Sequence, residues 1–145
     1  MRIDIGGENM KRQGFTLVEL LAVIVIIGII ALITSPVIMS MVAEAKKNAA
    51  IESFKTYKTA IEDIMIEELD DETFPEADEN GCYLLSEINT RTETKGNKPS
   101  DISADTKVCL DNGKVTQIDP ITMKGYSMAY KEEQGGILVD GKEVD

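Results

Sequence analysis

Residues 15–43 form a near-continuous apolar run, and this run constrains the fold more than any other part of the sequence. A helix rises about 1.5 Å per residue, so a bilayer core of about 30 Å needs about 20 residues. Residues 15–34 reach that length, and the run therefore predicts a membrane-spanning helix. One carboxylate, Glu19, lies close to its start. A charge in hydrocarbon is costly unless it is paired, neutralised or close to the interface, which makes Glu19 a candidate functional residue.

Basic residues flank the apolar run on both sides. Lys11 and Arg12 directly precede it and favour an orientation with the N-terminus inside the cell. Lys46 and Lys47 follow it and weaken that preference. We expect a single-pass membrane protein with its N-terminus inside and a head, residues 71–145, outside.

Beyond the run, the apolar residues narrow to a stripe without a break in the helical pattern. This pattern predicts one long helix from Phe15 to about Leu69, whose second part, residues 37–70, is amphipathic and needs a cover on one side. The stripe consists of Ile51, Phe54, Lys58, Ile61 and Met65, widened by Tyr57, Ile64 and Leu69, while Glu52, Lys55, Glu62 and Glu67 lie on other faces.

The C-terminal part of the head has the alternation and turn residues of β-hairpins. One hairpin is expected to join residues 106–110 to 114–118 through Asp111, Asn112 and Gly113, and another to join 126–131 to 136–140, with a further turn near 140–144. The stretch 82–88 fits either a short helical turn or a strand. The head is therefore predicted to be a small antiparallel meander.

One face of such a sheet must be buried, and the stripe of the long helix is the large apolar surface that can cover it. The predicted facing residues are Val108, Leu110, Val115, Ile118, Met128, Ile137 and Val139. The predicted fold class is α+β, with a long N-terminal helix packed against a small antiparallel sheet.

Composition excludes several functions. The formal net charge is −11 and most of the acid lies in the head, so the chain should repel phosphate backbones, and no direct nucleic-acid contact is expected. Histidine is absent and there are two cysteines, which removes the usual ingredients of zinc sites, Ser-His triads and Cys-His pairs. We expect no catalytic residue, no metal site and no cofactor.

The two cysteines, Cys82 and Cys109, lie in the part expected outside the membrane. That compartment is usually oxidising, which favours a disulfide over two buried free thiols.

The stretch "KRQGFTLVELLAVIVIIGIIALITSP", residues 11–36, resembles the processing and assembly segment of type IV pilins and their pseudopilin relatives. It joins a basic leader ending in glycine, a phenylalanine, a glutamate four residues later and an apolar helix. The resemblance implies that a prepilin peptidase cuts between Gly14 and Phe15, which removes a leader of residues 1–14, and that Phe15 becomes N-methylated. Either Met10 is the start, which gives a short leader, or the leader is a longer variant.

The resemblance also implies roles inside the helix of residues 15–36. The family's glutamate is thought to meet the N-terminal amine of a neighbouring subunit, which here means Glu19 and the amine of Phe15. Pro36 lacks an amide hydrogen and Gly28 weakens the same stretch. Filaments of the family often have this segment unwound, so these two residues are expected to mark where the helix melts or kinks, although Pro36 alone could be a harmless kink.

Taken together, the resemblance implies a structural subunit of a surface filament for adhesion, motility or DNA uptake. Its implied partners are other pilin subunits in a homopolymer, with minor pilins possible, the prepilin peptidase, a membrane assembly platform, and membrane lipid before assembly. It would lie in the cell membrane first and at the cell surface afterwards. The alternatives are a pseudopilin of a type II secretion-like system, a plain membrane anchor, or a secreted domain cut at an ordinary signal-peptide site after Ala45.

Overall fold

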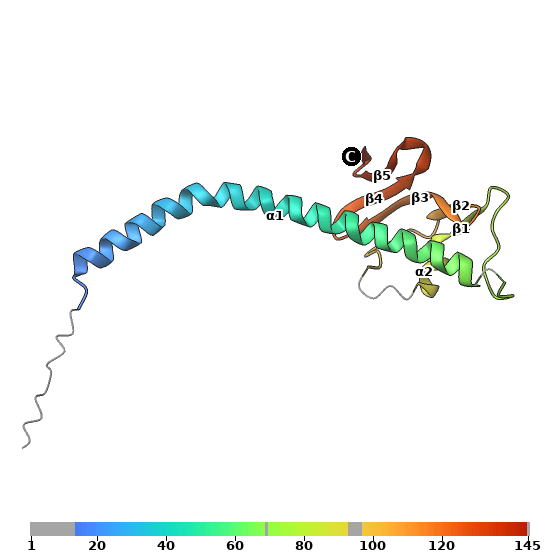
Figure 1. Ribbon diagram of the computed structural model, residues 1–145, viewed down its shortest axis with the longest axis horizontal. Helices are drawn as coiled ribbons and strands as arrows, with labels where there is room; N and C mark the ends of the chain where they lie inside the picture. The colour runs from blue at the N-terminus through green and yellow to red at the C-terminus, as the bar shows by residue number, and fades with distance from the viewer. Residues whose placement is uncertain (1–13, 69, 93–96, 145) are drawn as a thin grey trace, which may run out of the picture. The chain divides into compact units, whose positions relative to one another are not determined.

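The computed structural model describes residues 14–68, 70–92 and 97–144 (Figure 1). A long helix, α1 (Leu17–Glu68), is followed by a six-stranded antiparallel sheet, so the predicted α+β class is confirmed. The chain divides into two compact units between Met41 and Val42. In its described part, the first unit is almost entirely helix, and the second holds the rest of α1 together with the sheet.

Helix α1 closely follows the predicted span. It begins at Leu17, two residues later than predicted, because Thr16 is its N-cap, and it ends at Glu68. Leu69, which was predicted to be the last member of the stripe, lies outside the described residues.

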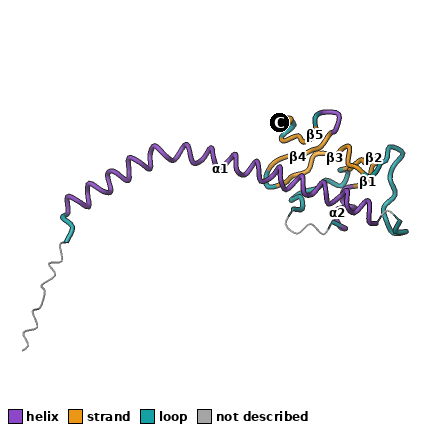
Figure 2. The backbone as a smooth tube through the Cα atoms, in the orientation of Figure 1, coloured by secondary structure: helices purple, strands orange, loops and turns teal. Residues whose placement is uncertain are grey.

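The sheet is a meander in which every strand pairs with its neighbours in the sequence (Figure 2). A short helix, α2 (Leu85–Arg91), follows the first strand, and a 3₁₀ turn, η1 (Glu132–Gln134), precedes the fifth. The strands are β1 (Cys82–Leu84), β2 (Lys107–Asp111), β3 (Lys114–Met123), β4 (Tyr126–Lys131), β5 (Gly136–Val139) and β6 (Lys142–Glu143). The stretch 82–88, which fitted either a strand or a helical turn, is both in succession.

The predicted turns are present. Asn112 and Gly113 have φ values of 50° and 77°, the pattern of a two-residue hairpin turn that Asn-Gly favours. Asp140 and Gly141 repeat it with 51° and 77° between β5 and β6. These turns place each strand back beside the one before it.

Strand β3 is longer than the pattern indicated. It continues through Pro120 to Met123, and its pairing with β4 shifts between Ile118 and Ile121. Proline cannot donate to a neighbouring strand, so its position at an irregularity is the expected one. The shift keeps Ile118, Ile121 and Met123 all buried.

The core of the second unit lies between α1, α2 and one face of the sheet. Phe54, Tyr57 and Ile61 of the stripe are fully buried, as the amphipathic pattern predicted. Of the predicted facing residues, Leu110 and Ile137 are only partly buried, because Leu110 follows a register shift and Ile137 lies on a short strand near the edge of the sheet. Further core residues that the pattern did not identify are Leu85, Ile88, Ile121 and Met123.

Lys58, the polar member of the stripe, is half-buried against the sheet. Its Nζ lies 2.6 Å from Glu62 Oε1 and 4.8 Å from the centre of the Tyr130 ring. Glu62 was predicted to lie on a face other than the stripe, but its side chain is only 21% exposed, and its Oε1 accepts a hydrogen bond from the Val115 backbone nitrogen. The helix therefore meets the sheet through a polar contact as well as through apolar packing.

Candidate functional site

The predicted cleavage point lies just ahead of helix α1. Gly14, Phe15 and Thr16 are not helical, and Phe15 is 88% exposed. The Gly14–Phe15 bond therefore lies outside the regular helix. The basic leader residues Lys11 and Arg12 lie outside the described residues, as does the rest of the leader before Gly14.

Thr16 and Glu19 form a reciprocal capping box at the start of α1. Glu19 Oε2 accepts hydrogen bonds from the Thr16 backbone nitrogen at 2.9 Å and from Thr16 Oγ1 at 3.2 Å. Thr16 Oγ1 in turn accepts a hydrogen bond from the Glu19 backbone nitrogen at 3.2 Å. The pattern T-x-x-E signals such a box, so the role of Thr16 was readable in the sequence but was missed.

The capping box fixes one oxygen of the Glu19 carboxylate. Within the described part of the chain, Oε1 accepts no hydrogen bond. The carboxylate is therefore held at the helix start by one oxygen while the other can accept a donor from outside the chain. A negative group is also favoured there by the partial positive charge of a helix N-terminus.

The first unit has an apolar surface around the whole helix. One helix in the described chain, α1, is long and apolar enough to cross a membrane, and its apolar window is entirely unburied. Side chains such as Leu21, Ile27 and Ile33 are more than half exposed. Such a surface is stable against lipid or other apolar helices rather than against water.

Gly28 and Pro36 both lie inside α1, which stays helical through them. A Cβ added to Gly28 would have no atom within 4 Å, so no close packing in this structure explains the glycine. Pro36 cannot donate the helix bond to the carbonyl of Leu32. Their predicted role in melting or kinking stays a prediction.

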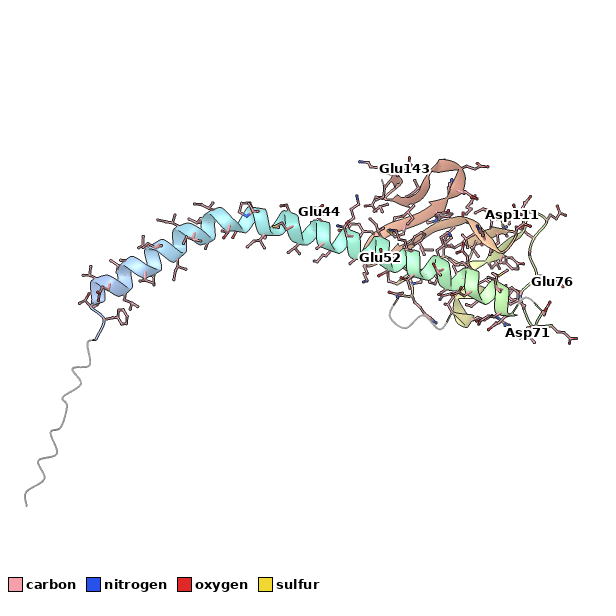
Figure 3. The ribbon with its side chains drawn as sticks, viewed as in Figure 1. Glu44, Glu52, Asp71, Glu76, Asp111 and Glu143 are labelled. Carbon is pink, nitrogen blue, oxygen red and sulfur yellow. A yellow bond between two sulfur atoms is a disulfide. The ribbon has the colours of Figure 1, made fainter. Side chains whose placement is uncertain are left out.

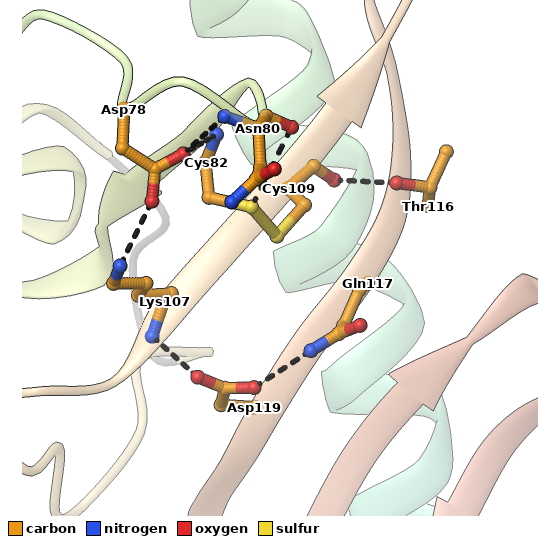
Figure 4. The surroundings of a disulfide bond; sticks show 8 residues. All are labelled: Asp78, Asn80, Cys82, Lys107, Cys109, Thr116, Gln117 and Asp119. Atoms are coloured by element: carbon orange, nitrogen blue, oxygen red, sulfur yellow. Dashed lines mark hydrogen bonds and ion pairs between the residues drawn. A yellow bond between two sulfur atoms is a disulfide. The ribbon is translucent and has the colours of Figure 1, made fainter.

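The disulfide joins Cys82 of β1 to Cys109 of β2, which are directly paired residues of the sheet (Figure 4). Asp78 lies beside it. Its Oδ1 accepts hydrogen bonds from the Asn80 and Cys82 nitrogens, and its Oδ2 lies 2.8 Å from Lys107 Nζ. These bonds, that from Lys107 first, lower the pKa of Asp78 to about 2. The loop before β1 is therefore tied to the sheet both covalently and by charge.

Arg91, the last residue of α2, ties the same loop to the end of α1. One guanidinium nitrogen lies 2.7 Å from Glu68 Oε2, and another donates to the Thr73 carbonyl oxygen at 2.7 Å. The hydrogen bond to Glu68 raises the pKa of Arg91 above its usual value. This cluster was missed because its members are far apart in the sequence, and no local pattern joins them.

The comparisons with known proteins agree with this arrangement. Residues 9–35 match the family described as the prokaryotic N-terminal methylation motif. The chain is 44% identical over 55 residues to "Fimbrial protein EcpB" of Eikenella corrodens, which covers 38% of this chain and 35% of that protein. It is 26% identical over 96 residues to "Type II secretion system core protein G" of Pectobacterium carotovorum subsp. carotovorum, which covers 66% of this chain and 59% of that protein.

The chain thus spans between about a third and three fifths of the length of these two relatives. No solved structure matches it significantly. The methylation motif covers the predicted cleavage point, the capping box and the first part of α1, whereas the longer match extends into the head. The motif, the two relatives and the α+β fold together support the similarity of this chain to type IV pilins and pseudopilins.

Proposed function

We propose that this protein is a structural subunit of a surface filament, made as a membrane-anchored precursor and polymerised through its N-terminal helix. The observation that carries the proposal is that the apolar N-terminal window of α1 is uncovered in this structure and has a single carboxylate at its start. An anchor alone would explain the apolar surface but not Glu19, which is costly in lipid unless it finds a partner.

A prepilin peptidase would act on the precursor at the Gly14–Phe15 bond. Hydrolysis of this bond by one water molecule gives a Gly14 carboxylate and a Phe15 amine, which is then N-methylated. The non-helical position of the bond supports this step, because a protease binds its substrate as extended backbone. The glycine also offers no side chain to obstruct that approach.

Glu19 would then pair with the Phe15 amine of a neighbouring subunit. Glu19 lies about 6 Å along the helix from Phe15, so pairing between copies sets an axial step of about that size. Such a pair neutralises both charges inside an apolar filament core, and its absence leaves them unpaired there. The polymer would include copies of this chain, with minor pilins possible, and would be built by a membrane assembly platform.

Before assembly, the subunit would be a single-pass membrane protein with its N-terminus inside and its head outside. After assembly it would lie at the cell surface, where such filaments serve adhesion, motility or DNA uptake. The fimbrial relative, which has the higher identity, supports a surface filament.

The second candidate is a pseudopilin of a type II secretion-like system. It is favoured by the match to core protein G, which covers more of this chain than the fimbrial match does. Deletion of the chain separates the two. Loss of sheared surface filaments with normal protein secretion supports the pilus, whereas loss of secretion without loss of surface filaments supports the pseudopilin.

The first test is the N-terminal peptide of the protein recovered from cells, measured by mass spectrometry after digestion. We expect a chain that begins at Phe15 and carries one added methyl group. A Gly14→Ala variant, which changes only the residue before the bond, should accumulate uncut. A wild-type chain that begins at Lys46 instead would mean a secreted domain and would contradict the proposal.

A further inference from the structure

The second unit carries opposite charges at its two ends. Lys46 and Lys47, the basic end, are exposed on α1 shortly after the unit begins. The acidic end is the loop of residues 70–79 beyond Glu68. Figure 3 shows its labelled members Asp71 and Glu76 at the opposite end of this unit from Glu44, which lies next to the basic end.

The charges at both ends are available to a partner. Neither lysine forms an ion pair within the described residues. In the loop, Asp71 lies near Arg91 and Asp78 near Lys107, but other carboxylates are exposed and likewise form no ion pair in that part of the chain. These are Asp70, Glu72, Glu76 and Glu79.

One copy cannot bring its two ends together. The helix from Lys47 to Glu68 is about 31 Å long, and it is continuous. At about 100° per residue, Lys46 projects from the helix about 160° away from the neighbouring Glu44, whereas Lys47 lies about 60° from it. Glu44 therefore offsets part of the Lys47 charge and leaves the Lys46 charge uncompensated. An ion pair between the two ends therefore requires two copies of the chain.

We propose that the basic end of one copy binds the acidic end of a second copy of this chain. A contact between two different surfaces can repeat from one copy to the next. When the rotation between successive copies does not close a ring, the copies form an open helical filament. The inference rests on the proposed function, since it describes a contact between heads in the same filament. When two copies are shifted by about 30 Å along the helix axis, about five of the 6 Å steps described above, the basic end of one lies at the same height as the acidic end of the other.

Charge complementarity also selects against wrong registers. Two acidic ends that meet repel each other, as do two basic ends, so the contact admits the head-to-tail arrangement and disfavours the others. An isolated exposed ion pair contributes little, but the contact recurs at every subunit, and its strength falls as salt screens the charges.

The decisive experiment is coupling of wild-type sheared filaments with a water-soluble carbodiimide. This reagent joins a lysine amine directly to a carboxylate with loss of water and adds no spacer. We expect digested peptides in which Lys46 or Lys47 is joined to a carboxylate of residues 70–79. Such a peptide must come from two copies, because the same groups are about 30 Å apart in one copy.

Charge reversal gives the second readout. The double variant Lys46→Glu and Lys47→Glu should yield about tenfold less sheared filament, equivalent to about 1.4 kcal/mol per contact. Adding Asp70→Lys, Glu72→Lys, Glu76→Lys and Glu79→Lys, which reverses the four loop carboxylates that form no ion pair, makes the loop net positive and should restore most of the yield. The matched control reverses Lys124 and Lys142, two exposed lysines outside both ends whose side chains form no ion pair or hydrogen bond in the described part of the chain, and should keep the wild-type yield.

The outcomes separate this inference from the proposed function. Wild-type filaments without these cross-linked peptides, together with normal yield from the double variant, would overturn the contact while leaving the filament intact. A wild-type chain that is neither processed nor found in filaments would overturn the proposed function and, with it, the contact. Loss of filaments in the Lys124 and Lys142 control would mean that total charge, rather than the basic end, controls assembly, and would overturn the contact.

Discussion

The Oε1 atom of Glu62 on α1 accepts a hydrogen bond from the backbone nitrogen of Val115 on β3, at 2.9 Å. The same oxygen lies 2.6 Å from Lys58 Nζ. One carboxylate oxygen therefore connects the helix to the beginning of the strand that forms the middle of the sheet. Such a bond fixes the position of the strand along the helix, which apolar packing alone leaves less defined.

Replacing Glu62 should therefore destabilise the head. Glu62→Ala leaves the Val115 amide and the Lys58 ammonium without an acceptor in a half-buried place, so we expect the free energy of unfolding to fall by about 1–3 kcal/mol. Glu62→Gln keeps an acceptor oxygen and should lose less. Chemical denaturation of the full chain in detergent measures both, and equal stability of the alanine variant and the wild type would contradict the role.

Asp78 should make the head acid-sensitive in a defined range. Its pKa is lowered to about 2 in the folded state, first by the hydrogen bond from Lys107, whereas an unfolded aspartate titrates near pH 3.9. The unfolded chain therefore binds a proton first as pH falls. The stability from this group is full above about pH 4 and is lost towards about pH 2.

The measurement for Asp78 is the melting temperature against pH for the wild type and for Asp78→Asn. The asparagine cannot ionise, so its deficit relative to the wild type should be largest near neutral pH and should shrink below about pH 4. A deficit that stays constant down to pH 2 would show that the charge of Asp78 contributes nothing.

The capping box should protect the first turn of α1. Thr16→Ala removes the two hydrogen bonds that involve the hydroxyl, and a lost N-cap costs about 1 kcal/mol, so exchange of the Glu19 amide hydrogen should quicken about fivefold. Thr16→Ser retains the hydroxyl and should exchange like the wild type. Hydrogen exchange of the chain in detergent checks this, and identical rates in all three proteins would argue against the box.

The Glu19 side chain accepts the hydrogen bonds of the cap and also carries a negative charge, and substitutions can separate these two roles. Glu19→Gln retains an acceptor for the cap but cannot pair with an amine as an ion, whereas Glu19→Ala loses both. If assembly needs the charge, both variants should reach the membrane yet yield no sheared filaments. Normal filaments from the glutamine variant would leave Glu19 with its capping role alone.

The disulfide should contribute substantially to the stability of a small head. Cys82 and Cys109 are separated by 27 residues, for which the chain-entropy model gives about 3.5 kcal/mol. Replacing both by serine should lower the melting temperature of the full chain in detergent. Because both cysteines are removed, no free thiol remains to form other bridges, and an unchanged melting temperature would show that β1 is held by its other contacts.

Local signals made much of the fold predictable. The pair Asn112 and Gly113 is by itself a hairpin-turn signal, and the apolar residues of the long helix repeat with helical spacing over many turns. Both elements could therefore be predicted without tertiary information. The stretch 82–88 could not be resolved, because three residues of strand and seven of helix are too short for a period to emerge. The extension of β3 was missed because Pro120 argues locally against a strand.

The site shows the same division. Gly14, Phe15 and Glu19 belong to one contiguous motif, from which their cleavage and assembly roles are predicted. The contacts of Glu62 and Arg91 instead depend on residues brought together only by folding. Polar side chains of this kind look like solvated surface in a sequence, because a charged residue on a helix usually is one. Their partners are a backbone amide and a carboxylate far away in the sequence, so no local sequence pattern indicates these contacts.

The meander order of the sheet has a consequence for how the head acquires its structure. Since the strands from β2 to β6 each pair with the next through a connection of a few residues, most contacts that form the sheet close short loops, and short loops cost little chain entropy. Such local topologies fold quickly. We expect strands β2 to β6 to form early, so that under the proposed function the head is folded before the subunit joins a filament.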